Sequence, residues 1–273
     1  MNLSTIQFKK NNGIKYLQNR DDGWPILMLH GNSLSKEIFK DQINSPLFEN
    51  YWMIAIDLPG HGERQINNAN LTLKYCIELI IEFLGTLKID HAILVGHSLG
   101  GHLAIQITKQ IKSIQGLFLY GTPPLSSFQK SIEPFARNRI NELIFKTGRS
   151  TEEISELARS MDPAEKRIEE LILMIKKSDD RIRTDIIALL QTGNFEDECQ
   201  IVQDFQKTKT IIIGTNDQVI NHDYIKWLSI NKPWGKTIRL VANLDHYSML
   251  EKPEEFNTLL LEFIQRAQLN VKT

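Results

Sequence analysis

Short apolar runs alternate with amphipathic stretches along most of the chain. Six runs of four or five mostly apolar residues predict strands at 26–29, 52–56, 92–95, 116–120, 210–213 and 237–241. Two further segments, 4–8 and 14–17, flank Asn11-Asn12-Gly13 and predict an antiparallel hairpin at the sheet edge. Helical spacing between the runs, at 71–87 and after Pro253, favours a mostly parallel eight-stranded sheet flanked by helices.

One long segment interrupts this alternation. From about 124 to 207 the chain shows helical patterns and no convincing strand, and Gly148, Pro163 and Gly193 punctuate it. An all-helical insertion between two strands of one sheet predicts a cap over the strand ends at which open α/β sheets bind ligands. We therefore predict a core of residues 1–123 and 208–273 and a helical cap of residues 124–207. A helical decoration that only stabilises the core is the alternative.

The composition is that of an ordinary globular protein, with 41% hydrophobic and 24% charged residues among 273. A formal net charge of −1 gives no electrostatic basis for binding nucleic acid or an anionic membrane. No signal-peptide pattern and no apolar stretch of membrane-spanning length is evident, so we expect a cytoplasmic protein. Cys76, Cys199 and the seven histidines show no metal-ligand spacing, and we expect neither a metal nor another cofactor.

The strongest chemical signal is the stretch Gly96-His97-Ser98-Leu99-Gly100, which follows a predicted strand and precedes a predicted helix. A serine between two glycines on a strand-to-helix turn is typical of a nucleophile elbow. Such a turn strains the serine backbone, and the glycines keep other side chains away from it. A glycine-rich turn with an incidental serine is the alternative, but the flanking strand and helix favour the nucleophile.

A serine hydroxyl is a weak nucleophile unless a base takes its proton and an acid orients that base. His246 follows the last predicted strand, and we expect it to be the base for Ser98. Asp217, just beyond the strand at 210–213, is the expected acid. Asp245 is the rival carboxylate. Because it is adjacent to His246, it would struggle to reach Nδ1 of the same ring while the ring faces Ser98.

Acyl transfer also requires hydrogen-bond donors for the developing oxyanion. The backbone N–H of Leu99, the residue after the nucleophile, is one expected donor. The loop at 30–33 supplies the other, with the N–H of Asn32 as the expected group, and its side-chain amide could also touch the substrate. We interpret His30 as structural. Asp57 and His61, in the turn-rich loop at 57–64, are interpreted as loop braces because the triad is complete without them.

Taken together, these residues resemble the α/β-hydrolase superfamily. The resemblance rests, in chain order, on His30-Gly31, Asp57-Leu58-Pro59-Gly60-His61-Gly62, Gly96-His97-Ser98-Leu99-Gly100-Gly101, Asp217 and His246. It covers nearly the whole chain outside the cap. It implies an α/β-hydrolase fold and a serine-dependent hydrolase, and it leaves the substrate open.

A closer likeness is to the N-acyl-homoserine lactone lactonases of this superfamily. It rests on the segments 29–33, 98–102, 121–124, 158–160 and 234–237. Two positions depart from the lactonase pattern. Gln218 stands where the lactonases carry a Glu just after the Asp of the acid loop, so Asp217 would have to serve as the acid. Leu157 stands where they carry a substrate-facing cap tyrosine, so this resemblance places Leu157 at the substrate.

The expected reaction is hydrolysis of a carboxylic ester or lactone through an acyl-enzyme, with N-acyl-homoserine lactones as the specific hypothesis. A general carboxylesterase, thioesterase or C–C bond hydrolase is the first alternative. A small-molecule receptor on the same fold, with little turnover, is an alternative of another class. The expected partner is a small ester or lactone, without nucleic acid or membrane, and the oligomeric state stays open. Five apolar cap residues could line an acyl pocket or pack inside the cap instead: Phe128, Phe135, Phe145, Met161 and Phe195.

Overall fold

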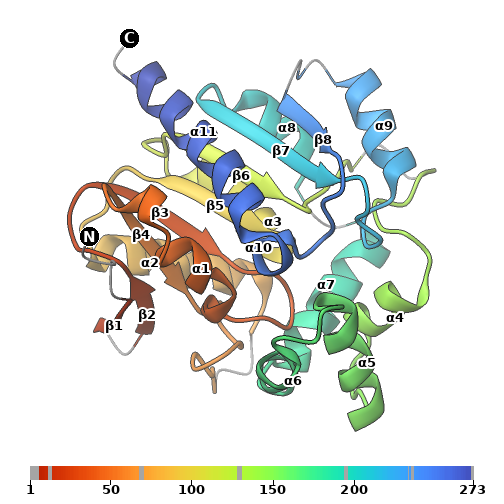
Figure 1. Cartoon of the computed structure of the whole chain (residues 1–273). Coiled ribbons are helices and arrows are strands. Elements are labelled where there is room, and N and C mark those ends of the chain that lie inside the picture. Colours follow the sequence, from red (N-terminus) through yellow and green to blue (C-terminus); the bar gives the residue numbers. More distant parts are fainter. Residues whose placement is uncertain are drawn as a thin grey trace.

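An eight-stranded sheet runs through the middle of the molecule (Figure 1). The computed structural model describes residues 6–11, 14–67, 71–127, 131–193, 196–232, 234 and 237–271. The strand order is β1-β2-β4-β3-β5-β6-β7-β8. The strands are β1 (Gln7–Asn11), β2 (Ile14–Gln18), β3 (Trp24–Leu29), β4 (Tyr51–Ile56), β5 (Ile93–His97), β6 (Gly116–Tyr120), β7 (Thr208–Gly214) and β8 (Ile238–Val241).

The six strands from β3 to β8 are parallel to one another, whereas β2 pairs antiparallel with both β1 and β4. All six apolar runs form strands, which confirms the predicted mostly parallel sheet of eight strands. Strands covered on both faces need apolar side chains on both, so they read as continuous runs. The predicted hairpin is confirmed where it is described, with Gln7 opposite Gln18. Residues 4–5 and the turn residues 12–13 lie outside the described residues.

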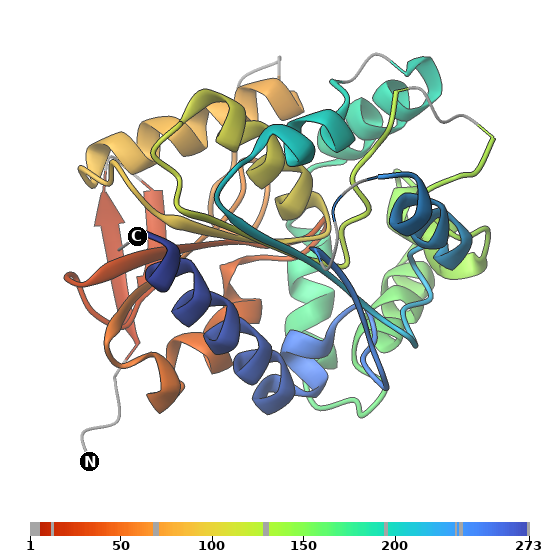
Figure 2. The same cartoon turned by 90° about the horizontal axis from the view of Figure 1, so that it is seen from above.

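Helices cover both faces of this sheet (Figure 2). One face carries α1 (Lys40–Ile43), α10 (Ser248–Glu251) and α11 (Pro253–Val271), and the other carries α2 (Leu73–Thr86), α3 (Leu99–Gln110) and α8 (Glu198–Asp204). The short helices η1 (Lys36–Phe39) and η2 (Pro46–Phe48) precede β4, and α9 (His222–Asn231) follows β7. The core forms where the sheet meets these layers. Phe118 of β6, for example, packs against Phe256 and Phe263 of α11, with ring centroids 5.8 and 5.4 Å away.

Between β6 and β7 the described residues form helices and no strand. These helices are α4 (Arg139–Phe145), α5 (Thr151–Met161), α6 (Ile168–Lys176) and α7 (Asp180–Thr192), followed by α8. The first four lie together at the lower right of Figure 1. They contact loops that leave the parallel strands: Asp179 N donates to Gly60 O at 2.8 Å, and Asn32 Nδ2 donates to Ile144 O at 3.1 Å. By contrast, α8 packs against α3 beside the sheet. The predicted cap over the strand ends, with its limits 124–207, stays a prediction, and below the word cap denotes only the described residues 131–192, which include α4 to α7.

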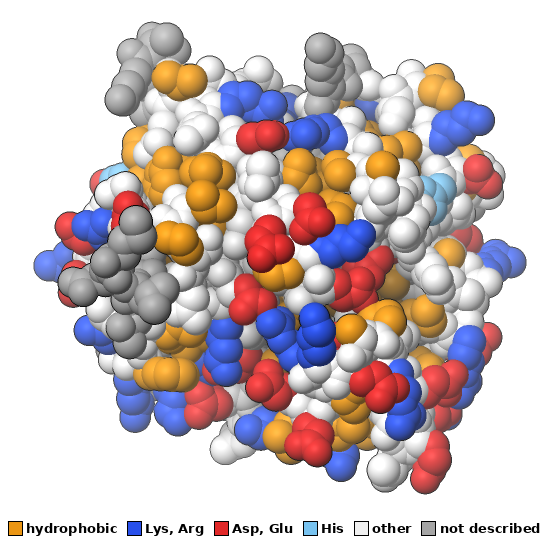
Figure 3. All heavy atoms as spheres, in the orientation of Figure 1, with side chains coloured by type: hydrophobic (Ala, Val, Ile, Leu, Met, Phe, Trp, Pro, Cys, Tyr) orange, Lys and Arg blue, Asp and Glu red, His pale blue; other side chains and the backbone are white. Residues whose placement is uncertain are grey.

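The face of the molecule shown in Figure 3 carries no single dominant charge. Acidic and basic side chains are intermixed over the face seen in Figure 3, as the net charge of −1 would suggest. Among the described residues, none of the helices has the length and the apolar character that a membrane-spanning segment requires.

Candidate active site

Ser98 occupies the turn between β5 and α3 with φ +50° and ψ −117°. A residue other than glycine rarely holds a positive φ, so this backbone is strained, as the sequence predicts. The surrounding glycines are required by close packing. A Cβ on Gly96 would lie 2.4 Å from Gly101 Cα, and one on Gly100 would lie 2.2 Å from Leu29 O. The turn therefore brings the start of α3 directly against the ends of β3 and β5.

Asp217 and His246 come together on the loops that follow β7 and β8. His246 Nδ1 lies 2.8 Å from Asp217 Oδ2, and both side chains are buried. The other carboxylate oxygen, Oδ1, accepts the backbone N–H groups of Val219 at 2.8 Å and Ile220 at 3.0 Å. The carboxylate is thus held in place, and it holds the proton of the imidazole on Nδ1. Nε2 is then left as the basic atom, which is what a base for Ser98 needs.

Asp245, the rival carboxylate, has other partners. Its Oδ1 accepts from Tyr247 N at 2.8 Å and from Ser248 Oγ at 3.0 Å. Its carbonyl oxygen accepts from Tyr120 Oη at 2.7 Å. Asp245 therefore shapes the turn that presents His246, while Asp217 contacts the ring.

Two further residues hold the His246 ring and its backbone. His97 Nε2 lies 2.9 Å from the carbonyl oxygen of His246, so that nitrogen donates its proton there. Gly121 has φ +57°, and a Cβ at that position would lie 2.8 Å from His246 Nδ1. The imidazole of His246 therefore occupies space that a side chain at position 121 would fill.

The two residues expected to supply the oxyanion donors, Asn32 and Leu99, line the same cavity as Ser98. Their backbone N–H groups make no hydrogen bond within the described residues. The side chain of Asn32 donates through Nδ2 to Ile144 O of the cap. Asn32 thus presents an unpaired N–H on a loop that the cap contacts.

Two cap arginines, Arg149 and Arg183, contact the residue after Asn32, which no sequence pattern predicts. Arg149 and Arg183 both donate to Ser33 Oγ, at 3.2 and 3.1 Å, and Ser33 has φ +64°. Arg149 also donates to Ile144 O at 2.7 Å. Burial lowers the pKa of Arg149 to about 10 and that of Arg183 to about 9, so both stay charged at neutral pH. They are 116 and 150 positions from Ser33, so no local spacing could reveal the contact.

The buried carboxylate of Asp57 braces its own loop. It accepts from Lys36 N and Lys36 Nζ, each at 2.9 Å, and from Glu63 N at 2.9 Å. Asp57 thus has a structural role, as expected from its place in the turn-rich loop.

The buried histidines beside this loop are also structural. His30 Nε2 accepts the N–H of Leu58 at 2.9 Å, so its proton lies on Nδ1, which donates to Gly31 O at 2.8 Å. His61 Nδ1 lies 3.2 Å from Pro59 O. Burial lowers the pKa of both imidazoles to about 3, so both are neutral at physiological pH.

A cavity of about 410 Å³ opens in front of Ser98. Its apolar wall comes from α3 and its neighbours and from the cap: Leu103, Phe135, Ile144, Phe145, Ile186, Leu189, Leu190 and Val219. Phe135 and Phe145 meet edge to face, with centroids 5.2 Å apart. This volume lies within the range of about 300–1,000 Å³ that small-molecule sites span. Of the two positions expected for Phe135 and Phe145, the wall of a pocket or the interior of the cap, the structure places both at the wall of this cavity.

Leu157 is placed differently from the expectation. It is 0% exposed and does not line this cavity, and the same holds for Met161 at 1%. Both belong to the apolar face of α5, which packs within the cap against α4 and α6. Core packing, not ligand contact, therefore accounts for Leu157, and it has no place in the proposed site. Phe128 and Phe195 lie outside the described residues.

A serine on a strained turn, a histidine–aspartate pair and two unpaired N–H groups are the parts that acyl transfer requires. In the described part of the chain no group of three or more histidine, cysteine or acidic side chains could hold a metal ion. Residues 26–259 match the alpha/beta hydrolase family, so the chain belongs to this family. The resemblance noted from the motifs is confirmed.

Several known proteins are similar over most of the chain. The crystal structure of the N-acyl homoserine lactonase AidH complexed with N-butanoyl homoserine superposes with a TM-score of 0.83 at 25% identity, covering 96% of this chain and 97% of that one. The dihydrolipoyllysine-residue acetyltransferase component of the acetoin cleaving system of Cupriavidus necator is 26% identical over 94% of this chain and 68% of its own. "Putative esterase/lipase 2" of Mycoplasma genitalium is 25% identical, over 87% of this chain and 88% of its own.

Proposed function

We propose that this protein hydrolyses carboxylic esters, including lactones, through an acyl-enzyme on Ser98. The observation that carries the proposal is the 2.8 Å contact between Asp217 Oδ2 and His246 Nδ1, on loops beside a strained serine that faces an apolar cavity. The α/β-hydrolase family membership and the similarity to the Mycoplasma genitalium relative support an esterase.

The proposed reaction follows from the parts. Ser98 Oγ attacks the carbonyl carbon while His246 Nε2 takes the hydroxyl proton, and Asp217 stabilises the imidazolium without taking that proton. The N–H groups of Asn32 and Leu99 hold the oxyanion, where each such donor typically contributes about 3–4 kcal/mol. His246 then protonates the leaving alkoxide. In a lactone this oxygen stays attached to the acyl group. Water resolves the acyl-enzyme by the same path in reverse.

We propose N-acyl-homoserine lactones as the specific substrates. The similarity to AidH over nearly the full length of both chains supports this choice. The apolar wall of the cavity, with Phe135 and Phe145, suits the hydrocarbon part of an acyl chain. Asp217, in contact with the ring, takes the acid role that the lactonase pattern gives to the next position, and the side chain of Gln218 is exposed.

A general carboxylesterase is the second candidate. The position of the lactonases' substrate-facing tyrosine is held here by Leu157, which is buried inside the cap, so that contact to a lactone head group has no counterpart at this position.

A substrate panel tests both candidates. N-butanoyl- and N-hexanoyl-homoserine lactone are assayed beside p-nitrophenyl butanoate and hexanoate at neutral pH, with Ser98→Ala as the control for spontaneous hydrolysis. We expect the lactones to be opened by the wild-type protein and not by Ser98→Ala. Turnover of the p-nitrophenyl esters without lactone opening would replace the lactonase by the general esterase. No Ser98-dependent turnover of any substrate would refute the hydrolase itself.

A further inference from the structure

The apolar cavity in front of Ser98 contains a second histidine–carboxylate pair that the triad does not use. His102, on the first turn of α3, and Glu198, at the start of α8, both line it. His102 Nδ1 lies 2.7 Å from Glu198 Oε2, and the two side chains are 14% and 5% exposed. A buried pair of this kind costs desolvation energy and needs an explanation beyond simple packing.

The surroundings fix the orientation of the imidazole. Glu198 Oε2 also accepts the N–H of Leu125 at 2.9 Å, so the carboxylate is anchored independently of the histidine. Phe135 packs edge to face on the ring of His102, with centroids 6.4 Å apart. The carboxylate keeps the proton on Nδ1, as Asp217 does for His246. Nε2 is therefore the atom that can accept a hydrogen bond.

This Nε2 atom has no hydrogen-bond partner within the described residues. It is also not one of their fully buried polar atoms that lack a partner, so it is exposed to some extent. Since His102 lines the cavity, the unpaired nitrogen is accessible from it. His102 follows Ser98 by one helical turn, which is a rise of about 6 Å. Helical side chains lean toward the N-terminus, so the ring of His102 leans toward the nucleophile's end of α3.

We propose that the His102–Glu198 pair is a polar subsite for the acyl group, which selects substrates with a hydroxyl or amide N–H a few bonds from the scissile carbonyl. His102 Nε2 accepts the hydrogen bond, and Glu198 holds the tautomer that makes this possible. The apolar side chains beyond the pair take the rest of the chain. The proposal rests on the proposed function, since it concerns the acyl half of the same substrate.

Binding to Ser98→Ala tests the subsite without requiring turnover. The ligands are three ethyl esters of equal chain length: hexanoate, 3-hydroxyhexanoate and 3-oxohexanoate. The hydroxyl group can donate a hydrogen bond, whereas the ketone of similar size can only accept one. Dissociation constants come from NMR titration. We expect the 3-hydroxy ester to bind about tenfold more tightly than either of the others, the effect of one added hydrogen bond.

The same titrations are repeated on Ser98→Ala/His102→Phe, which keeps an aromatic ring against Phe135. In this variant we expect the three esters to bind with about equal dissociation constants, so that the 3-hydroxy preference is lost. A role of the pair only in attaching α8 to α3 would leave the preference unchanged. Equal binding of the three esters to Ser98→Ala, or a preference that survives His102→Phe, would overturn the subsite. Preference without hydrolysis by the wild-type protein would uphold the subsite and refute the proposed reaction.

Discussion

The arrangement around Ser98 depends on residues that have no side chain as much as on those that do. Gly96 and Gly100 let the turn close, and Gly121 leaves room for the imidazole of His246. None of these glycines would take part in the chemistry. Each determines where a reacting atom can lie, so a single methyl group is enough to test the geometry.

Gly121→Ala is expected to displace His246, because the new Cβ would lie 2.8 Å from its Nδ1. An error of about 1 Å in such a site lowers kcat about a hundredfold. Steady-state kinetics on a p-nitrophenyl ester measure this loss.

Gly148→Ala is the matched control. Gly148 has φ +62°, close to the +57° of Gly121, but a Cβ there would meet nothing within 4 Å. Both substitutions add backbone strain of roughly 1–2 kcal/mol, and only Gly121→Ala should impair kcat. Equal kcat values for the two variants would contradict the position of His246 described above.

At the scale of elements, the cap and the oxyanion loop form one hydrogen-bonded unit. Arg149 and Arg183 share Ser33 Oγ, and Asn32 Nδ2 donates to the end of α4. The proposed oxyanion donor therefore depends on helices that are more than a hundred positions away in the sequence.

Ser33→Ala removes the acceptor that both guanidinium groups share. We expect kcat for an ester to fall about tenfold with KM little changed, because the loop bearing the Asn32 N–H loses part of its support.

Ser178→Ala serves as the comparison. Ser178 Oγ also accepts from Arg183, at 2.9 Å, but it lies between α6 and α7. Both variants should lose stability, by about 1–3 kcal/mol for an unpaired buried donor, and only Ser33→Ala should lose kcat. A full kcat in Ser33→Ala would exclude a positioning role for the arginine pair.

The strands and the candidate triad were predictable because each rests on a local pattern. A parallel strand covered on both faces is a continuous apolar run, and Ser98, Asp217 and His246 each lie within a short turn or loop after a predicted strand. The contacts that support them are different. His102 meets Glu198 across 96 positions and Arg149 meets Ser33 across 116, and neither has a periodic signal.

Leu157 illustrates the same limit. The sequence predicts helices between 124 and 207, but which face of α5 is turned to the cavity depends on how α4 and α6 pack against it. A resemblance transfers a position along the chain, whereas the direction of a side chain is set by tertiary packing.

At the scale of the whole molecule, buried neutral histidines make the fold sensitive to acid. Burial lowers the pKa of His30 and His61 to about 3 and that of His97 well below its ordinary value. In the unfolded chain these groups titrate near 6.5. The folded state therefore binds fewer protons below pH 6.5. Its stability is fully present above that pH and is lost as the pH falls toward 3.

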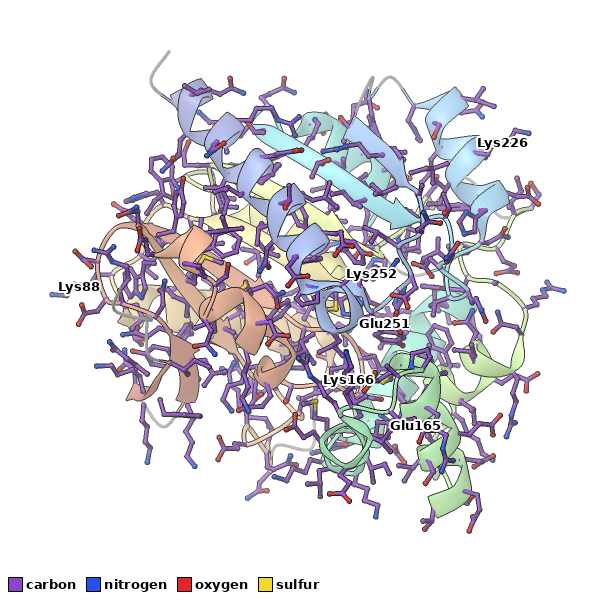
Figure 4. The ribbon with its side chains drawn as sticks, viewed as in Figure 1. Lys88, Glu165, Lys166, Lys226, Glu251 and Lys252 are labelled. Carbon is purple, nitrogen blue, oxygen red and sulfur yellow. The ribbon has the colours of Figure 1, made fainter. Side chains whose placement is uncertain are left out.

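Glu251 acts in the opposite direction. Glu251 is the last residue of α10. In the view of Figure 4 it lies above the segment that contains Glu165 and Lys166. Burial, aided by Asp245 and Asp162, raises its pKa to about 8. The folded state therefore gains stability from this group as the pH falls from 8 toward the ordinary value of 4.5.

Urea unfolding of the Glu251→Gln variant across pH isolates the histidines. Each buried imidazole that stays neutral is expected to lower the free energy of unfolding by about 1.4 kcal/mol for each pH unit below 6.5. The three together should lower the free energy of unfolding by about 4 kcal/mol between pH 7.5 and 5.5. The fall should be smaller when Glu251 is present. A free energy that stays constant over this range in Glu251→Gln would contradict the burial of neutral histidines.

The central claim is that Ser98 is activated by His246 and that Asp217, not Asp245, orients that base. The rate of fluorophosphonate labelling, followed by intact mass and peptide mapping, tests it most directly. We predict one adduct, on Ser98, and none in Ser98→Ala. Labelling should slow by about 10⁴-fold in Asp217→Asn and by less than about tenfold in Asp245→Asn. An adduct that persists in Ser98→Ala, or two Asn variants that react at the same rate, would contradict the account.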